Sequence, residues 1–242
     1  MMDAPGINVE GKAAINGVPL FASLRLEITG GAWTCLLGGS GVGKSTILRL
    51  IAGLDTGAFF EGSINASDGK AVQSRVAYMA QDDLLLPWAT VAENVALGAR
   101  LRGETPDAAR VKRLLERTGL SEHSVKRKDQ LSGGQRQRVA LARTLMEDKP
   151  VILLDEPFSA LDAKTRSEMH ELAVELLMGR TVLMVTHDPA EAARLGHSIA
   201  ILAPKGIELF EPPATEIPRA HDVLETLQCQ AALMRELRAP AA

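Results

Sequence analysis

A glycine-rich segment from Gly38 to Thr46, with the sequence GGSGVGKST, carries the clearest chemical pattern in the chain. It matches G-x-x-x-x-G-K-[ST], with Gly38, Gly43, Lys44 and Ser45 at the fixed positions. The backbone N–H groups of such a loop face one concavity, and a helix that begins near Lys44 adds the positive end of its dipole. Lys44 can then contact β- and γ-phosphates, and the Ser45 hydroxyl is a hard oxygen ligand for Mg²⁺. The segment therefore predicts a polyphosphate site.

The segments on either side are of the kind that would hold this loop in place. Trp33–Leu37 is a mostly apolar run that predicts a short buried strand before the loop. Apolar residues at helical spacing in Ser45–Leu54 predict a helix after it, ending at Gly53. A strand-to-helix turn that binds no ligand is the alternative interpretation, but the number of matching fixed positions favours the phosphate site.

Two acidic side chains stand at the end of another apolar run. Val151–Leu154 contains only apolar residues and is followed by Asp155 and Glu156, as in a central parallel strand that presents polar groups at its carboxyl edge. Thr181–Val185 repeats this arrangement and is followed, one residue later, by His187. Helix capping or surface exposure is the alternative for the two carboxylates, and a structural role is the alternative for the histidine.

A second anion site is predicted at Leu131–Gln135, which reads LSGGQ and precedes a helical pattern. Ser132 stands where an N-cap residue belongs. Gly133 and Gly134 carry no side chains that would cover the first N–H groups of the helix. A helix N-terminus with accessible N–H groups attracts anions.

Together these motifs resemble those of the ATP-binding subunits of ABC transporters. The glycine-rich loop is followed, in the family's order and at comparable spacing, by Gln81, LSGGQ, VILLDEP, the SALD of Ser159–Asp162 and the THD of Thr186–Asp188. The match covers roughly Leu20 to Leu202. A phosphate-binding loop alone fits many functions, whereas its combination with LSGGQ is close to diagnostic.

The resemblance implies ATP and Mg²⁺ as cofactors and ATP hydrolysis as the reaction. Phosphoryl transfer to water needs charge neutralised on the γ-phosphate and a water held in line, so the protein mainly positions groups. Glu156 would be the general base, with His187 and Gln81 as further catalytic residues, although a lone Gln after a strand is usually structural. The implied metal ligands are Ser45, Gln81 and Asp155. The implied nucleotide contacts are Gly38, Gly39, Ser40, Gly41, Val42, Gly43, Lys44, Ser45, Thr46, Ser132, Gly133, Gly134, Gln135 and Asp162.

The same resemblance implies that two copies of the chain act together. In the family, LSGGQ closes over the nucleotide of a second protomer through its helix dipole and serine hydroxyl. We therefore expect a head-to-tail homodimer with two ATP molecules between the subunits, and Asp162 at the interface.

Two positions depart from the family's pattern. The family usually places a Tyr or another aromatic residue in its N-terminal sheet to stack on adenine, but Ile7 to Leu20 contains none. Base stacking, and with it the preference for ATP over GTP, is therefore expected to be weak. Gly39 stands where Pro is common, which should loosen the loop slightly without changing its chemistry.

Composition limits the possible partners. The chain has 242 residues and a formal net charge of −3, which gives no basic field and argues against a nucleic-acid surface. Cys35 and Cys229 lie in unlike settings and are expected to be free thiols. The first residues lack the pattern of a signal peptide. The longest apolar runs are far shorter than the ~20 residues of a membrane-spanning helix, so we expect any membrane association to go through a partner.

The predicted fold class is α/β, with a P-loop NTPase (RecA-like) core, an N-terminal antiparallel β subdomain and an inserted helical subdomain. Residues 1–242 are expected to form a single ATPase domain, with the insertion at about 82–140 and a C-terminal tail at about 211–242. Alternation in Ser23–Thr29 predicts a strand of the antiparallel sheet. Within the insertion, Asn94–Leu101 predicts one helix. Thr105-Pro106-Asp107 predicts the start of another, with Pro at its first position, and Ser121–Lys128 predicts a solvated loop.

The resemblance favours a bacterial importer, because the ATPase chain carries no fused membrane span. Gln81–Gly98 is similar to the nitrate/sulfonate/taurine branch, whose relatives include importers of thiamine pyrimidine precursors. Implied partners are integral-membrane permease subunits and a solute-binding protein, at the cytoplasmic face of the inner membrane. Trp88 would either line the groove for a permease helix or belong to the subdomain core. A non-transport ABC ATPase in DNA repair or translation is the main alternative, and a P-loop nucleotide kinase would leave LSGGQ without a purpose.

Overall fold

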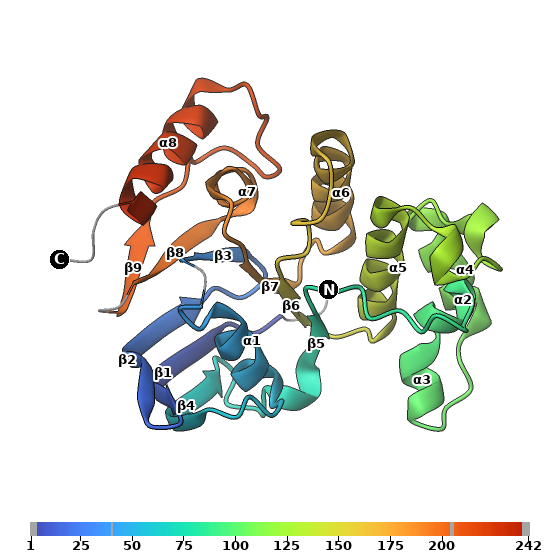
Figure 1. Ribbon diagram of the computed structural model, residues 1–242, viewed down its shortest axis with the longest axis horizontal. Coiled ribbons are helices and arrows are strands. Elements are labelled where there is room, and N and C mark those ends of the chain that lie inside the picture. The colour runs from blue at the N-terminus through green and yellow to red at the C-terminus, as the bar shows by residue number, and fades with distance from the viewer. Residues whose placement is uncertain (1–3, 40, 204–205, 239–242) are drawn as a thin grey trace.

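Two β-sheets with helices packed against them form the protein. The computed structural model describes residues 4–39, 41–203 and 206–238. The smaller sheet is antiparallel, with the order β2-β1-β4, and the larger sheet has the order β5-β6-β7-β3-β8-β9 (Figure 1). Strands of the smaller sheet are β1 (Ile7–Ile15), β2 (Val18–Ile28) and β4 (Phe59–Ala66). Strands of the larger sheet are β3 (Trp33–Leu37), β5 (Val76–Met79), β6 (Val151–Asp155), β7 (Thr181–Val185), β8 (Ser198–Ala203) and β9 (Gly206–Phe210).

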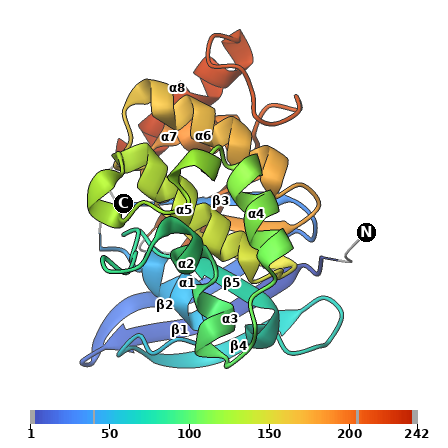
Figure 2. The ribbon, with the colours of Figure 1, turned by 90° about the vertical axis from the view of Figure 1, so that its right-hand side faces the viewer.

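Helices cover both faces of the larger sheet, and a group of them extends to one side (Figures 1 and 2). The larger sheet is parallel except for β9, which pairs antiparallel with β8. The α-helices are α1 (Lys44–Ala52), α2 (Val91–Val95), α3 (Leu97–Leu101), α4 (Ala108–Arg117), α5 (Gly133–Met146), α6 (Ala163–Leu176), α7 (Pro189–Leu195) and α8 (Leu224–Arg238). Short 3-10 turns occur at η1 (Gln73–Arg75), η2 (Ser121–His123) and η3 (Lys128–Gln130). No helix among the described residues is long and apolar enough to cross a membrane.

Strand β6 is apolar from Val151 to Leu154 because both faces of the larger sheet are buried. Alternate residues of β6 enter two different apolar clusters. Val151 and Leu153 pack with α1 and the antiparallel sheet, whereas Ile152 and Leu154 pack with the helices of the opposite face. A strand between two such layers needs apolar side chains at every position. This burial places the first polar side chains at the strand ends, where the candidate site lies.

The predicted fold class is confirmed, and several local predictions need correction. The pattern over Asn94–Leu101 is not one helix, because α2 starts earlier, at a Thr90 capping box, and Ala96 separates it from α3. Pro106 lies outside α4, because the Asp107 side chain accepts the Arg110 N–H and caps the helix there. Strand β1 was not predicted. The helix predicted after LSGGQ is α5, which extends to Met146.

Residues 121–128 are also more ordered than the predicted solvated loop. The backbone carbonyls of Ser124 and Lys126 accept the N–H groups of Ala92 and Val91, at 3.0 and 2.8 Å. This segment therefore lies against the start of α2. The two cysteines are free and buried, and burial raises the pKa of both thiols.

Asp148 supports a prediction about stability and pH. Arg110 and Arg180 contact its carboxylate at 2.8 and 3.2 Å, and these hydrogen bonds lower its pKa from 3.8 to about 2. The depressed pKa means that the stabilisation is present above pH 3.8 and is lost as the pH falls toward 2. Because the side chain is 45% exposed, Asp148→Asn should cost no more than about 1 kcal/mol at neutral pH. Asn also tolerates the φ of 52° at this position.

Urea unfolding of wild type and Asp148→Asn across an acid titration measures this effect. The difference between the urea midpoints of wild type and Asp148→Asn should become smaller as the pH falls from 3.8 toward 2. Asp222→Asn, at an exposed carboxylate, is the matched control and should show little gap at any pH. A gap for Asp148→Asn that does not depend on pH would exclude the ion pairs as its cause.

Candidate functional site

The glycine-rich loop joins β3 to α1, as the sequence predicts. Gly43 has a φ of 102° and precedes Lys44, the first residue of α1. The Lys44 side chain is buried, and its Nζ donates to the carbonyls of Gly38 and Gly39 at 2.8 Å each. Burial lowers the pKa of Lys44, while Glu156 and Asp155 oppose that shift. The ammonium group is therefore held within the loop, close to two carboxylates.

The remaining loop residues have different surroundings. Gly41 and Thr46 line a pocket of about 490 Å³ beside the loop, whereas Val42 packs against the apolar cluster that includes α1. Gly39 has space around it, since among the described residues an added Cβ would meet only a Val42 methyl carbon, at 3.7 Å. Ser40 lies outside the described residues.

Ser45 and Asp155 form a pair of hard oxygen groups. The Ser45 hydroxyl donates to Asp155 Oδ1 at 2.8 Å, and the Tyr78 hydroxyl donates to Asp155 Oδ2 at the same distance. Asp155 is the last residue of β6, and the neighbouring strand β5 brings Tyr78 beside it. Burial raises the pKa of Tyr78, so the phenol remains a donor. This tyrosine was not predicted, although it is the single Tyr of the chain.

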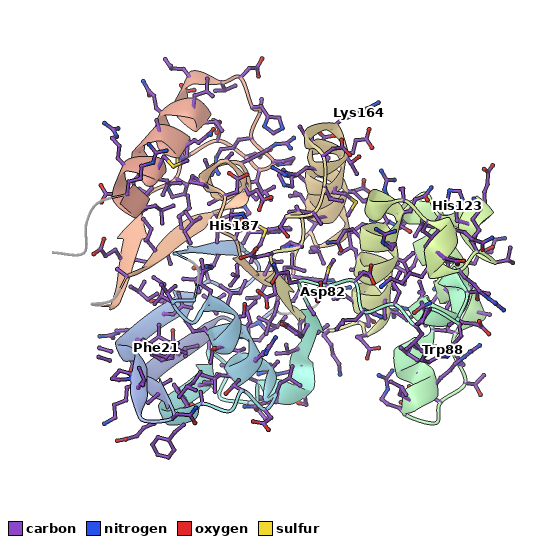
Figure 3. The ribbon with its side chains drawn as sticks, in the orientation of Figure 1. Phe21, Asp82, Trp88, His123, Lys164 and His187 are labelled. Carbon is purple, nitrogen blue, oxygen red and sulfur yellow. The ribbon has the colours of Figure 1, made fainter. Side chains whose placement is uncertain are left out.

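Glu156 meets the two other residues that were expected to be catalytic. Its Oε2 accepts the side-chain N–H of Gln81 at 3.3 Å and lies 2.9 Å from His187 Nδ1. Gln81 follows β5, Glu156 follows β6 and His187 follows β7, and these strands are neighbours in the sheet. Figure 3 shows His187 near the centre of the molecule. Glu156 has a φ of 45°, a strained backbone that turns its side chain at the strand end.

One pocket collects these groups. Its lining includes Lys44, Ser45, Gln81, Glu156 and His187. It combines a loop suited to phosphates, a hydroxyl–carboxylate pair next to it and a carboxylate that can accept a proton from water. The arrangement suits phosphoryl transfer to water.

Aliphatic side chains stand on another wall of the pocket. Ile15, at the end of β1, and Leu20, on β2, line it, and Leu20 approaches Gly43 so closely that an added Cβ would lie 2.8 Å from its Cδ2. The sequence did not identify which residues replace the missing aromatic. An aliphatic wall can contact a base by dispersion but offers no π-face for stacking.

Ile15→Tyr is therefore expected to tighten ATP binding by about tenfold, because stacking of a base on an aromatic ring is worth about 1–3 kcal/mol. The gain should be small for inorganic triphosphate, which has no base. Equilibrium binding of ATP, GTP and triphosphate measures it. Val18→Tyr is the control, since Val18 is exposed on β2 and does not line the pocket. Equal gains for ATP and triphosphate would show that the tyrosine does not contact the base.

The LSGGQ residues form a separate group. Ser132 caps α5 by accepting the Gln135 N–H, and the Gln135 side chain accepts the Ser132 N–H in return, at 2.9 Å. Gly133, at the first turn of α5, has open space in front of it, since its nearest neighbour is an Arg136 nitrogen at 3.9 Å from an added Cβ. None of these residues lines the pocket around Lys44. Within one subunit, the structure therefore brings together the loop, Gln81 and the strand ends, but not LSGGQ.

Two further residues belong to the LSGGQ group. An added Cβ on Gly134 would lie 2.4 Å from a Thr165 methyl, and Asp162 caps α6 through the Thr165 N–H and hydroxyl. The start of α6 therefore lies beside the start of α5. His123 was not predicted; its Nε2 lies 2.9 Å from Gln135 Nε2 (Figure 3 labels the histidine). Its partner sits 12 residues away in sequence, which no local pattern reveals.

The chain is similar to several known proteins. The model of the ABC transporter family matches residues 21–159. An uncharacterised ABC transporter ATP-binding protein of Haemophilus influenzae is 48% identical over 191 residues, which is 78% of either chain. An aliphatic sulfonates import ATP-binding protein of Agrobacterium fabrum is 43% identical over 77% of this chain and 71% of its own. A protein of the same name from Mesorhizobium japonicum is 42% identical over 92% of this chain and 86% of its own.

The matched family region includes the loop, Gln81, LSGGQ, Asp155 and Glu156, and the relatives named for sulfonate import agree with the resemblance of Gln81–Gly98 to the nitrate/sulfonate/taurine branch. The chain belongs to the ABC transporter family as an ATP-binding subunit that hydrolyses ATP to drive transport.

Proposed function

We propose that this protein powers uptake of a small solute through a separate permease, and that the solute is an organosulfonate or a related small molecule of the nitrate/sulfonate/taurine or thiamine pyrimidine-precursor classes. The pocket that combines Lys44, Ser45, Gln81, Glu156 and His187 carries the ATPase part of this proposal. The names of the sulfonate-import relatives support the direction of transport. They also favour transport over a role in DNA repair or translation.

The residues of the pocket divide the work of hydrolysis. Lys44 would exchange the carbonyls of Gly38 and Gly39 for phosphate oxygens when ATP binds. Glu156 would accept the proton of the attacking water, while Gln81 and His187 hold its carboxylate in position. After product release, the same contacts can re-form.

Ser45 and Asp155 fit a bound Mg²⁺, because a hydroxyl and a carboxylate 2.8 Å apart are the hard oxygen donors that this ion prefers. When bound, Mg²⁺ neutralises charge on the β- and γ-phosphates. Tyr78 would orient Asp155 through its hydrogen bond. Gln81 was also expected to be a ligand, and its amide oxygen could take that role when its N–H donates to Glu156.

A second copy of the chain would complete the site. Ser132, Gly133, Gly134 and Gln135 present a capped helix N-terminus, yet they lie apart from the pocket of their own subunit. We infer a head-to-tail homodimer in which this N-terminus and the nearby Asp162 face the γ-phosphate bound by the partner copy. Residues 1–242 would act as one ATPase domain, with an insertion at about 82–140 and a tail at about 211–242.

The helices beside the larger sheet offer a surface for the permease. A groove of about 600 Å³ has apolar walls that include Ala92, Ala96, Val111 and Leu115. Trp88 lies just before α2 and is 70% exposed, which contradicts the alternative that it belongs to the subdomain core (Figure 3). A cytoplasmic helix of the permease is the occupant that import function requires, with a solute-binding protein on the other side of the membrane.

Trp88→Ala should weaken docking to the permease by about 30-fold, the effect of losing one large aromatic contact at an interface. ATP binding by the isolated subunit should stay unchanged, because Trp88 does not line the nucleotide pocket. Titration of the subunit into permease in detergent or nanodiscs measures the affinity. Leu209→Ala is the control, since Leu209 is 79% exposed on β9, away from α2–α5 in Figure 1. Equal losses for both variants would contradict the proposed surface.

The transported solute can be identified from its effect on the ATPase rate of the assembled transporter. The chain is co-expressed with the permease and binding protein encoded beside its gene, and hydrolysis is measured against sulfonates, taurine, nitrate and pyrimidines. We expect stimulation by one of these solutes. If no solute changed the rate of ATP hydrolysis, the assignment to this importer branch would lose its support, while the assignment as an ATPase would stand.

A further inference from the structure

Asp83, two residues after Gln81, sits in a cluster of positive side chains. Its carboxylate contacts Lys128 Nζ at 2.6 Å and Arg136 Nε at 3.3 Å, and it also accepts the Leu85 N–H at 3.0 Å. The side chain is only 15% exposed. Burial by itself would raise the pKa of Asp83, but the Leu85 N–H and the two cations outweigh it and lower the pKa. The carboxylate is therefore ionised and held from three directions.

The backbone beside Asp83 is held by the same helix. Arg143, two turns further along α5 than Arg136, donates to the carbonyls of Asp83 and Leu84 at 2.6 and 2.9 Å. Leu84 has a φ of 46°, which is unfavourable for a residue with a branched side chain. A strained residue persists where its surroundings fix it, and here α5 supplies the fixing contacts.

These contacts join three functional regions. Gln81 contacts Glu156. On the other side of Asp83, Leu84 and Trp88 are exposed, and Trp88 belongs to the surface proposed for the permease. Arg136, which holds Asp83, directly follows LSGGQ and also donates to the Leu131 carbonyl at 2.8 Å. The Asp83 side chain thus ties the segment after Gln81 to the segment that opens α5.

We propose that Asp83 is a positioning residue that couples the 81–88 segment to the LSGGQ residues of the same subunit. Permease docking at Trp88 then affects two places: the catalytic carboxylate through Gln81, and the partner's nucleotide through Arg136 and the start of α5. The part of this inference that concerns the permease and the partner copy rests on the proposed function. The link from Asp83 to α5 rests on the contacts within one subunit.

The chain supplies a matched pair of variants. Asp83→Asn keeps the size of the side chain and its capacity to accept the Leu85 N–H, but it removes the charge that Lys128 and Arg136 contact. Asp82 is the neighbouring carboxylate, is exposed and does not line the pocket. Asp82→Asn therefore removes the same charge from the same segment without touching the cluster.

Hydrogen exchange of the isolated subunit tests the link directly. In Asp83→Asn, amides of residues 131–138 should exchange about tenfold faster, because charge-assisted contacts that hold this turn are lost. Amides of β6 and β7 serve as the reference and should not change. Asp82→Asn should match wild type in both regions. Equal exchange of residues 131–138 in Asp83→Asn and wild type would overturn the inference.

A double-mutant cycle keeps the test decisive if Asp83→Asn also lowers global stability. Lys128→Met alone should speed exchange of the same turn, and adding it to Asp83→Asn should have less effect than it has alone. Fully additive effects would mean that the two side chains act independently, which contradicts the inference.

The effect of Asp83→Asn on the ATP site shared with the partner copy is measured in a protein that also carries Glu156→Gln. The ATP concentration needed for half-maximal dimer formation, measured by light scattering, should rise about tenfold with Asp83→Asn, while ATP binding by the single subunit stays unchanged. An unchanged midpoint with Asp83→Asn contradicts the coupling. Absence of an ATP-dependent dimer in the Glu156→Gln parent would instead contradict the proposed function, and the exchange result would still decide the link within the subunit.

Discussion

Glu156→Gln is expected to slow ATP hydrolysis by about 10²–10⁴-fold, because the amide cannot accept the proton of the attacking water. ATP binding should change little. Gln has the same size as Glu, and the loop contacts of Lys44 do not involve residue 156. With ATP bound and hydrolysis blocked, the variant should accumulate as a dimer. Phosphate release gives the rate, and chromatography with and without ATP gives the oligomeric state.

Glu208→Gln is the matched control for this substitution. Glu208 is an exposed carboxylate on β9, outside the pocket, so its replacement should leave both rate and oligomeric state as in wild type. If Glu156→Gln turned over ATP at the wild-type rate, the assignment of Glu156 as the general base would be wrong.

Ser132→Arg is expected to reduce hydrolysis by about two orders of magnitude while ATP binding by the single subunit stays within about twofold. Ser132 caps α5 and lies outside the pocket of its own subunit, so a bulky cation there should disturb only the ATP site that it completes in a second copy. Loss of the cap should cost about 1 kcal/mol of stability, too little to unfold the domain.

Two control variants distinguish the loss of the helix cap from the steric effect of the introduced arginine. Ser132→Thr retains a capping hydroxyl and should keep most of the activity. Ser74→Arg places the same side chain on an exposed serine of η1 and should leave hydrolysis unchanged. Loss of monomeric ATP binding in Ser132→Arg would refute a site shared between two subunits.

The sequence was most informative where a local pattern and burial coincide. Val151–Leu154 is apolar at every position and Trp33–Leu37 at every position except Thr34, because both faces of their sheet are covered. Their ends could therefore be predicted as the places for polar groups. Gln81, Glu156 and His187 follow three neighbouring strands, and parallel topology brings such residues to one edge.

The remaining features depend on contacts between distant parts of the chain. Tyr78 reaches Asp155 across 77 positions, and Lys128 reaches Asp83 across 45. Neither tyrosine nor aspartate carries a local signal of such a partner. The break between α2 and α3 also follows from context, since the helical pattern of Asn94–Leu101 continues through Ala96.

Mixing two inactive variants tests the shared ATP site most directly. Glu156→Gln and Ser132→Arg each inactivate both ATP sites of a homodimer. A mixed dimer, however, contains one site with an intact Glu156 from one subunit and an intact Ser132 from the other. If the sites act independently, the equimolar mixture should recover roughly a quarter of the wild-type single-turnover rate, because about half of the dimers are mixed and each has one intact site. A mixture as inactive as either variant alone would contradict a site built from two subunits.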